Sequence, residues 1–199
     1  MDWGRPAYVK KCYCQRSNLL MPLKIIDEND LPLIFSWRNH PKVRENMYST
    51  HEITWEEHKS WFEKVKIDPT IKYFLYMDNH LPLGVINFTQ FYPARGNAFW
   101  GFYAGADSPK GTGIKMEYEA LEYAFNVLNL HKLNCEVIYF NQAVINLHRK
   151  SGFMEEGLFR DFHYDGKAYH HVVRLGILKN EWLAIKDLIR ARITDIEKK

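Results

Sequence analysis

The stretch 101–130, GFYAGADSPKGTGIKMEYEALEYAFNVLNL, decides how this chain folds. A strand rich in aromatic residues and glycine, 97–105, runs into a short loop at 106–113. The loop leads directly into an amphipathic helix, because apolar residues recur at helical spacing from Ile114 onward. The strand predicted after this helix, 132–140, completes a strand–helix–strand crossover, so we expect these two strands to be parallel.

The loop before that helix holds two glycines around Thr112. Glycine lets the backbone approach a ligand closely, and the first turn of a helix leaves N–H groups without partners. Those groups and the helix dipole together favour an anion. The run Lys110-Gly111-Thr112-Gly113 therefore indicates a turn that holds phosphate, although a plain turn explains it equally well. It is neither a Walker loop nor the dinucleotide fingerprint, because the residues that complete those motifs are missing.

Patterns on either side of the crossover predict further hairpins and helices. Two more strands precede residue 97 through tight turns, and an Asp165-Gly166 turn joins the last two. We expect strands at 23–26, 71–77, 81–92, 97–105, 132–140, 153–162 and 169–179, and helices at 27–39, 55–66, 114–128, 141–151 and 181–199. The predicted fold class is α/β, with a mixed, mostly antiparallel central sheet and helices on both faces.

Length and composition limit the function classes. The 199 residues are 46% hydrophobic and 15% aromatic, which excludes disorder and suits one main domain. A net charge of +3 suits a small anionic ligand and does not indicate nucleic acid. No apolar run approaches the ~20 residues that span a bilayer, so we expect no membrane partner. The cysteines do not form a disulfide framework, and free thiols suit a cytoplasmic protein.

The chain divides into three parts. Residues 1–20 lack any period, and we expect them to be an N-terminal extension outside the core. The folded domain covers 21–180, and a charged helix, 181–199, ends the chain. A truncation that begins at Met21 should therefore fold and keep its activity. The sequence leaves the oligomeric state open, a homodimer included.

Two motifs resemble the GNAT superfamily of N-acetyltransferases. The first is the pyrophosphate loop, usually Gln/Arg-x-x-Gly-x-Gly/Ala, here residues 108–113, SPKGTG. The second is Asn-x-Ala-x-x-x-x-Tyr-x-Lys-x-Gly-Phe, here residues 141–153, NQAVINLHRKSGF. Two positions depart from the family pattern: Ser108 stands where Gln or Arg is usual, and His148 where Tyr is usual. Lys110 can replace the lost contact as a point charge.

This resemblance implies acetyl-CoA as cosubstrate and direct transfer of the acetyl group. The parallel strand pair would be splayed, with its backbone N–H groups facing the cofactor, and the loop would hold the pyrophosphate. Asn141 would bond the cofactor amide, unless it is only a helix cap. The implied cofactor residues are Phe102, Tyr103, Ala104, Lys110, Gly111, Thr112, Gly113, Ile114, Asn141 and Lys150.

Two residues are candidates for the acid–base chemistry. His148 lies on the inner face of its predicted helix, where it is either a general acid for the CoA thiolate or a satisfied core histidine. Glu136 is the only carboxylate in an apolar strand, so it is either the base that accepts the amine proton or an outward surface charge. Cys135 shows no paired histidine in the sequence, so an acyl-enzyme is not expected. We expect no metal site.

The N-terminal half resembles, more narrowly, the acetyltransferases of pseudaminic acid biosynthesis. The runs WRNHP at 37–41 and MYST at 47–50 carry this likeness. It implies that the acceptor is the 4-amino group of UDP-4-amino-4,6-dideoxy-N-acetyl-β-L-altrosamine, on the route to surface or flagellin glycans. The residues implied for the acceptor are Arg38, Met47, Tyr48, His58, Phe62, Thr89 and Phe99.

Alternatives remain at several of these positions and for the function. Arg38 could form only a helix-face ion pair, and Met47 and Phe62 could be core residues. Trp100 lies on the opposite strand face from Phe99, and we expect it in the core. A protein N-terminal or polyamine acetyltransferase is the alternative within the same fold. A non-catalytic module that binds acyl-CoA or a nucleotide sugar is the alternative of another class.

Overall fold

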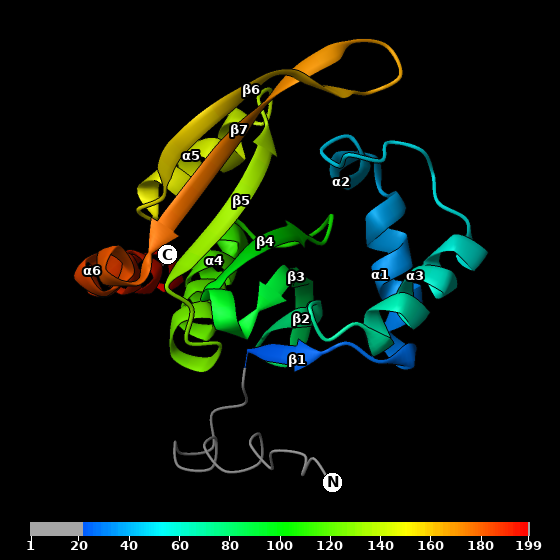
Figure 1. Ribbon diagram of the computed structural model, residues 1–199. Helices are drawn as coiled ribbons and strands as arrows, with labels where there is room; N and C mark the ends of the chain where they lie inside the picture. Colours follow the sequence, from blue (N-terminus) through cyan, green and yellow to red (C-terminus); the bar gives the residue numbers. More distant parts are fainter. Residues whose placement is uncertain (1–21, 199) are drawn as a thin grey trace, which may run out of the picture.

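A computed structural model describes residues 22–198, so the predicted extension at 1–20 lies outside the described residues (Figure 1). The strands are β1 (Leu23–Ile25), β2 (Lys72–Asp78), β3 (Leu81–Tyr92), β4 (Asn97–Ala104), β5 (Lys132–Ile138), β6 (Met154–Tyr164) and β7 (Tyr169–Leu178). The helices are α1 (Leu31–Asn39), α2 (Pro41–Arg44), α3 (Trp55–Ile67), α4 (Thr112–Glu122), α5 (Gln142–Lys150) and α6 (Lys179–Glu197).

The seven strands form one sheet in the order β1-β2-β3-β4-β5-β7-β6. Every neighbouring pair is antiparallel except β4 and β5, which are parallel. The parallel pair results from the crossover through α4, and the hairpins account for the antiparallel flanks. The predicted mixed, mostly antiparallel sheet with helices around it is therefore confirmed.

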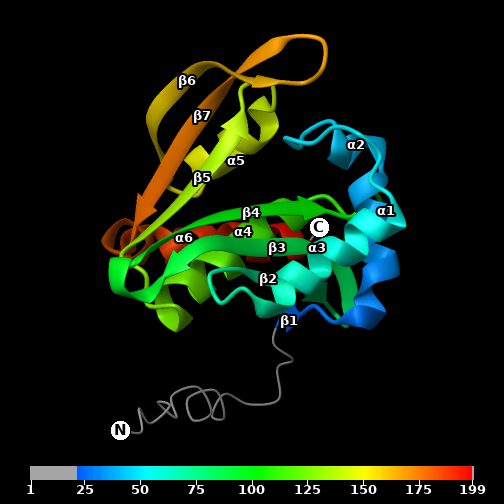
Figure 2. The same ribbon diagram turned by 45° about the vertical axis from the view of Figure 1, so that its right-hand side comes forward.

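The pairing of β4 with β5 is short. It joins Asn97 to Lys132, Ala98 to Leu133 and Phe99 to Asn134, and it ends there. Beyond this point β4 continues along β3, while β5 continues along β7. Figure 2 shows β5 and the β6–β7 hairpin turning away from β4. The sheet thus opens into a V whose apex lies at the end of the parallel pair.

Helices cover both faces of the sheet, because successive side chains of a strand point to opposite faces and apolar side chains occur on both. On β2, Phe74 and Tyr76 join the larger core with α4, α5 and α6, whereas Leu75 joins a smaller core with α1 and α3. The C-terminal helix α6 contributes fully buried Trp182 to the larger core and packs on α4. The larger core therefore supports α4, α5 and α6, and the smaller core supports α1 and α3.

Three local features differ from the sequence expectation. The helix expected at 27–39 begins as a 3-10 turn, Glu28–Asp30, capped by Asp27, and α1 follows with Pro32 in its first turn. The short helix α2 was not predicted from the sequence, because its cap is His40, an unusual capping residue. The central helix ends in a π turn, Tyr123–Val127, which periodicity does not distinguish from regular helix.

Two negative findings hold for residues 22–198. No helix there is long and apolar enough to cross a membrane. No group of three His, Cys, Asp or Glu side chains there could hold a metal ion.

Candidate active site

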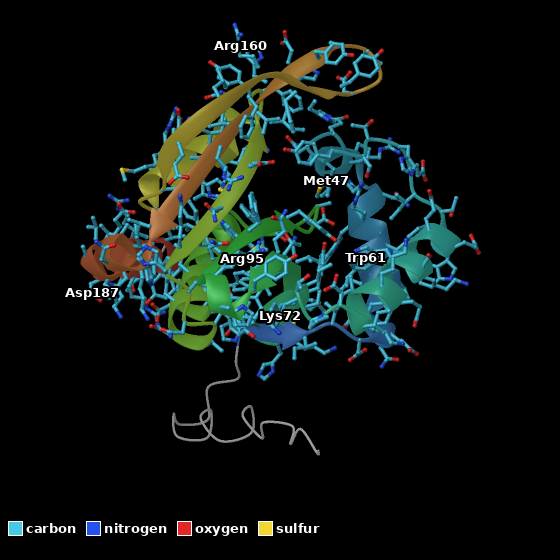
Figure 3. The ribbon with its side chains drawn as sticks, in the orientation of Figure 1. Met47, Trp61, Lys72, Arg95, Arg160 and Asp187 are labelled. Carbon is cyan, nitrogen blue, oxygen red and sulfur yellow. The ribbon has the colours of Figure 1, made fainter. Side chains whose placement is uncertain are left out.

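The opening between β4 and β5 leads into a cavity of about 970 Å³. One wall, formed by β4, β5 and α5, carries residues expected to bind the cofactor and is called the cofactor wall. The wall formed by residues 34–61 of the α1–α3 segment carries residues expected to bind the acceptor and is called the acceptor wall. In Figure 3, Met47 lies on the side of the α2 segment that faces β4 and β5. The predicted residues that line the cavity are Arg38, Met47, Tyr48, His58, Thr89, Phe99, Phe102, Tyr103, Ala104, Glu136, Asn141 and His148.

The remaining predicted residues lie elsewhere. Phe62 is 3% exposed and packs in the smaller core with α1, so it does not line the cavity. Lys150 is exposed at the end of α5, where its carbonyl accepts a hydrogen bond from Arg192. The loop 110–113 and Ile114 are at the start of α4, outside the cavity lining. The structure therefore separates the predicted pyrophosphate loop from the residues predicted to act on the acetyl group.

The start of α4 has the geometry of an anion site. Gly111 occupies the cap position with φ of 90°, a left-handed conformation that favours glycine, and no side chain caps this helix. The Thr112 hydroxyl donates to the Pro109 carbonyl at 2.8 Å and stabilises the loop. Lys110 is exposed beside it. The Thr112 N–H donates to the Pro109 carbonyl at 3.2 Å, but the helix start lacks a side-chain cap, so the N–H groups of Gly113 and Ile114 can receive a phosphate.

His148 is buried on α5 and bonded to a carboxylate that sequence reasoning missed. Its Nδ1 lies 2.6 Å from Oε1 of Glu117 on α4. The other oxygen, Oε2, accepts from the Ser151 hydroxyl at 2.9 Å, and Glu117 is fully buried. A signal was present, because Glu117 falls between Ile114 and Leu121 in the apolar stripe of the helix. A charge within such a stripe indicates a buried partner.

Cys135 of β5 is a neighbour of His148 that the sequence did not reveal. The two side chains interact electrostatically, and both line the cavity. Their proximity could not be recognised from the sequence because it depends on how α5 packs across β5. Burial disfavours the charged imidazole, but Cys135 and Glu117 outweigh it and raise the pKa of His148 above its ordinary value.

Aromatic rings complete the surroundings of His148. Trp100 and Phe102 of β4 approach it at centroid distances of 5.4 and 6.0 Å, and Phe153 at 5.1 Å. Trp100 is 4% exposed and belongs to the larger core, as its strand face predicts. It also lines the cavity, and its Nε1 is buried without a hydrogen-bond partner among the described residues.

Glu136 lies between the two walls of the cavity. Its Oε1 accepts from Arg174 at 2.9 Å, and its Oε2 accepts from the Tyr48 hydroxyl at 3.0 Å. The Arg174 guanidinium lies 4.0 Å from the centroid of the Phe99 ring. Burial and the Glu136 charge raise the pKa of Tyr48 well above its ordinary value, so its phenol stays protonated and donates. The carboxylate retains further lone pairs for a substrate.

Arg38 and His58 both lie on the acceptor wall, but they differ in how fully their side chains are hydrogen-bonded. The Arg38 Nη2 donates to the carbonyl and hydroxyl of Ser49 at 2.8 and 2.5 Å, while its Nη1 is buried without a partner among residues 22–198. His58 is 2% exposed, its Nε2 lies 3.1 Å from the Leu31 carbonyl, and its ring stacks on Trp61. Burial lowers the pKa of His58, so it is neutral. Arg38 thus has an open donor, whereas His58 is structurally engaged.

The β6–β7 hairpin meets the acceptor wall across the cavity. The ring centroids of Tyr48 and His163 are 5.2 Å apart, and the Thr50 hydroxyl lies 3.5 Å from the Asp165 carbonyl. Figures 1 and 2 show this hairpin extending toward the α2 segment. These contacts join parts of the chain that are far apart in sequence.

The comparisons with known proteins agree with this geometry. Residues 21–154 match the family model of the acetyltransferase (GNAT) domain. The acetyltransferase PseH of Campylobacter jejuni is 31% identical over 139 residues, which cover 70% of this chain and 86% of that protein. The spermidine N(1)-acetyltransferase of Vibrio cholerae is 27% identical over 169 residues, covering 83% and 97% of the two chains.

A solved structure extends the likeness to the fold. The Vibrio cholerae spermidine N-acetyltransferase in complex with CoA and spermine superposes with a TM-score of 0.76 at 22% identity, covering 81% of this chain and 96% of that one. The family model matches more than half of the described chain and includes the splayed strands and the loop before α4. The chain belongs to the GNAT family and is an acetyl-CoA-dependent N-acetyltransferase.

Proposed function

We propose that this enzyme transfers acetyl from acetyl-CoA to the 4-amino group of a UDP-linked 4-amino-4,6-dideoxy sugar, in the cytoplasm. The observation that carries this proposal is that, among the charged side chains lining the cavity, an arginine has an open donor and the carboxylates are already engaged. The charged Lys, Arg, Asp and Glu side chains among the described lining residues are Arg38, Lys42, Glu57 and Glu136.

Both carboxylates of that set are already engaged. Glu57 accepts from the Thr54 backbone N–H at 2.6 Å, as in a capping box, and Glu136 accepts from Arg174. Arg38 keeps a buried donor without a partner among the described residues. A guanidinium with an open N–H suits the diphosphate of a nucleotide sugar, whereas a polycation would need free carboxylates. The likeness to PseH supports the same acceptor.

Acetyl-CoA would lie in the V between β4 and β5. Beyond the last β4–β5 pair, the Gly105 N–H donates to the Leu83 carbonyl on the β3 side, and successive residues of a strand point their N–H groups to opposite edges. The N–H groups of Phe102 and Ala104 therefore face the open side, where they can hold the pantetheine arm and polarise the thioester carbonyl, and Tyr103 between them lines the cavity. The loop 110–113 and Ile114 would bind the pyrophosphate at the start of α4. Asn141 accepts from the Val144 N–H at 3.3 Å as a helix cap, and its amide N–H₂ stays available to the cofactor. Lys150 would contribute positive charge near the cofactor.

The transfer would be direct. The neutral amine attacks the thioester carbonyl, Glu136 accepts the amine proton directly or through water, and His148 protonates the departing CoA thiolate. Met47, Tyr48 and Phe99 would form an apolar wall for the sugar methyl group. His58 would not contact the acceptor through a hydrogen bond and would only shape the acceptor wall. The Thr89 hydroxyl would donate a hydrogen bond to the acceptor.

A polyamine is the second candidate acceptor, because the Vibrio spermidine acetyltransferase aligns over 97% of its own length. The experiment measures CoA release with acetyl-CoA and each acceptor in turn: a UDP-4-amino-4,6-dideoxy sugar, spermidine, and a peptide with a free N-terminus. We expect turnover with the nucleotide sugar and at least tenfold lower kcat/KM with the others. Preferred turnover of spermidine would overturn the proposed acceptor.

The matched variants are Arg38→Met and Arg44→Met. Arg44 is a neighbouring cation outside the cavity lining that pairs with Glu52 at 3.4 Å. Losing a hydrogen bond to a charged group costs about 1.5–3 kcal/mol, so Arg38→Met should raise KM for the nucleotide sugar roughly 10- to 100-fold. Arg44→Met should leave it unchanged. An equal effect of both variants would show that only general charge matters.

A further inference from the structure

Glu117 is a buried charge that the reaction described above does not use. It is 0% exposed on α4, and the cost of burying an isolated carboxylate is prohibitive. Its two oxygens are taken by His148 Nδ1 at 2.6 Å and by the Ser151 hydroxyl at 2.9 Å. The carboxylate thus joins the middle of α4 to both a cavity-lining residue and the end of α5.

This arrangement fixes the tautomer of the imidazole. An ionised carboxylate only accepts hydrogen bonds, so the Nδ1 of His148 must carry a hydrogen. The nitrogen that gains and loses a proton is therefore Nε2. The rings of Trp100, Phe102 and Phe153 surround the imidazole and restrict its rotation.

Charge adds a second effect to this positioning. The titratable groups packed against the imidazole are Glu117 from α4 and Cys135 from β5, while β4 and residue 153 contribute only aromatic rings. Although burial opposes it, these two groups raise the pKa of His148. An ordinary histidine, with a pKa of about 6.5, is mostly neutral at pH 7.5 and has little proton to give.

We propose that Glu117 is a positioning residue, which holds His148 in one tautomer and keeps it protonated so that its Nε2–H is delivered to the CoA thiolate. This inference rests on the proposed function, in which His148 is the acid. When the thioester C–S bond breaks, the sulfur keeps the electron pair and takes the Nε2 proton, giving CoA–SH. The neutral imidazole still donates from Nδ1 to Glu117, and it recovers a proton from solvent after CoA leaves.

The kinetic test compares Glu117→Gln with Glu119→Gln. Glu119 is a second carboxylate of α4 that does not line the cavity. It interacts electrostatically with Arg190 rather than with His148. Without the Glu117 charge, His148 returns toward its ordinary pKa, so kcat should fall at least about 30-fold at pH 8 and less than about twofold at pH 6. KM for acetyl-CoA and the Glu119→Gln profile should match the wild type. A loss that is the same at every pH would overturn the proposal.

A second measurement needs no activity. Nitrogen-15 NMR of the full wild-type chain reports the His148 imidazole, assigned by its absence in His148→Gln. We expect an imidazolium through pH 8, with Nδ1 protonated at all pH values. A neutral ring at pH 7 would overturn the inference. If no amine is acetylated yet the imidazolium persists, the proposed function fails and the pairing stands.

The Cys135 contact provides the last test. Cys135, His148 and Glu117 could also act as nucleophile, base and orienting group. Incubation with acetyl-CoA and no amine, followed by intact mass measurement, should show no acetyl group on the protein. An acetyl group on Cys135, lost together with activity in Cys135→Ala, would overturn the acid role of His148, because the imidazole would then be a base.

Discussion

The cofactor wall and the acceptor wall of the cavity differ in how they are held. Strands β4 and β5 and helix α5 bury side chains in the larger core, including Trp100, Val137 and Ile145. The acceptor wall rests on the smaller core and meets the rest of the cavity through isolated contacts, such as Tyr48 with Glu136 and Thr50 with Asp165, which are 88 and 115 residues apart in sequence. A tightly packed wall suits a reaction step common to the family, and a loosely joined wall suits an acceptor that varies.

Glu136 tests this comparison most strongly, because it touches both walls. In Glu136→Gln, the loss of the proton acceptor should lower kcat about 100-fold or more, with a smaller change in KM. Steady-state kinetics with acetyl-CoA and the preferred amine measure both constants. A variant in which only KM changes would remove the base role and leave Glu136 as the residue that holds Tyr48 and Arg174.

Gly113 tests cofactor binding alone, at the predicted pyrophosphate turn before α4. A Cβ there would lie 3.2 Å from Leu147 Cδ2, and a larger side chain would crowd the predicted pyrophosphate turn. Gly113→Val should raise KM for acetyl-CoA about tenfold or more, and KM for the acceptor should stay the same. Calorimetric titration with CoA checks the cofactor affinity directly. Equal changes for both substrates would mean that the two walls are not independent.

The stability of the cofactor wall should depend on pH through His148. Its pKa in the folded protein is raised above the unfolded value. The stabilisation from the charged imidazole is therefore fully present below about pH 6.5, and it is lost as the pH rises through the folded pKa. Urea unfolding of wild type and His148→Gln at several pH values should show the wild-type advantage shrinking between these two pKa values, by about 1.4 kcal/mol for each pH step of one. A difference independent of pH would contradict this.

Thr50→Val should have the smallest effect. It removes a long contact of 3.5 Å between the acceptor wall and the hairpin. Such polar contacts near the surface contribute little, so the free energy of unfolding should change by less than about 0.5 kcal/mol, and KM for the acceptor by about twofold at most. A tenfold change in KM would show that the hairpin holds the acceptor wall in place.

The sequence was sufficient for the parts of the fold that depend on short patterns. The loop at 110–113, the motif at 141–153 and the hairpin turns predicted the crossover, the parallel pair and the placement of His148 beside the cavity. The sequence was insufficient for Phe62, because its position on the helix does not show whether the side chain packs in the core or lines the cavity. The roles of the predicted site residues stay predictions until the variants above are measured.

The sequence by itself determined the order of the strands and longer helices, the sheet class and the family, because each depends on periodicity, turn residues or motifs within a few turns of chain. Only the tertiary structure decided that Glu117 and Cys135 meet His148, and that Tyr48 and Arg174 share Glu136. Those pairs join different elements, and the packing of α4 and α5 against the sheet sets their distances. Local sequence patterns do not specify this packing, although the chemistry of the site depends on the packing.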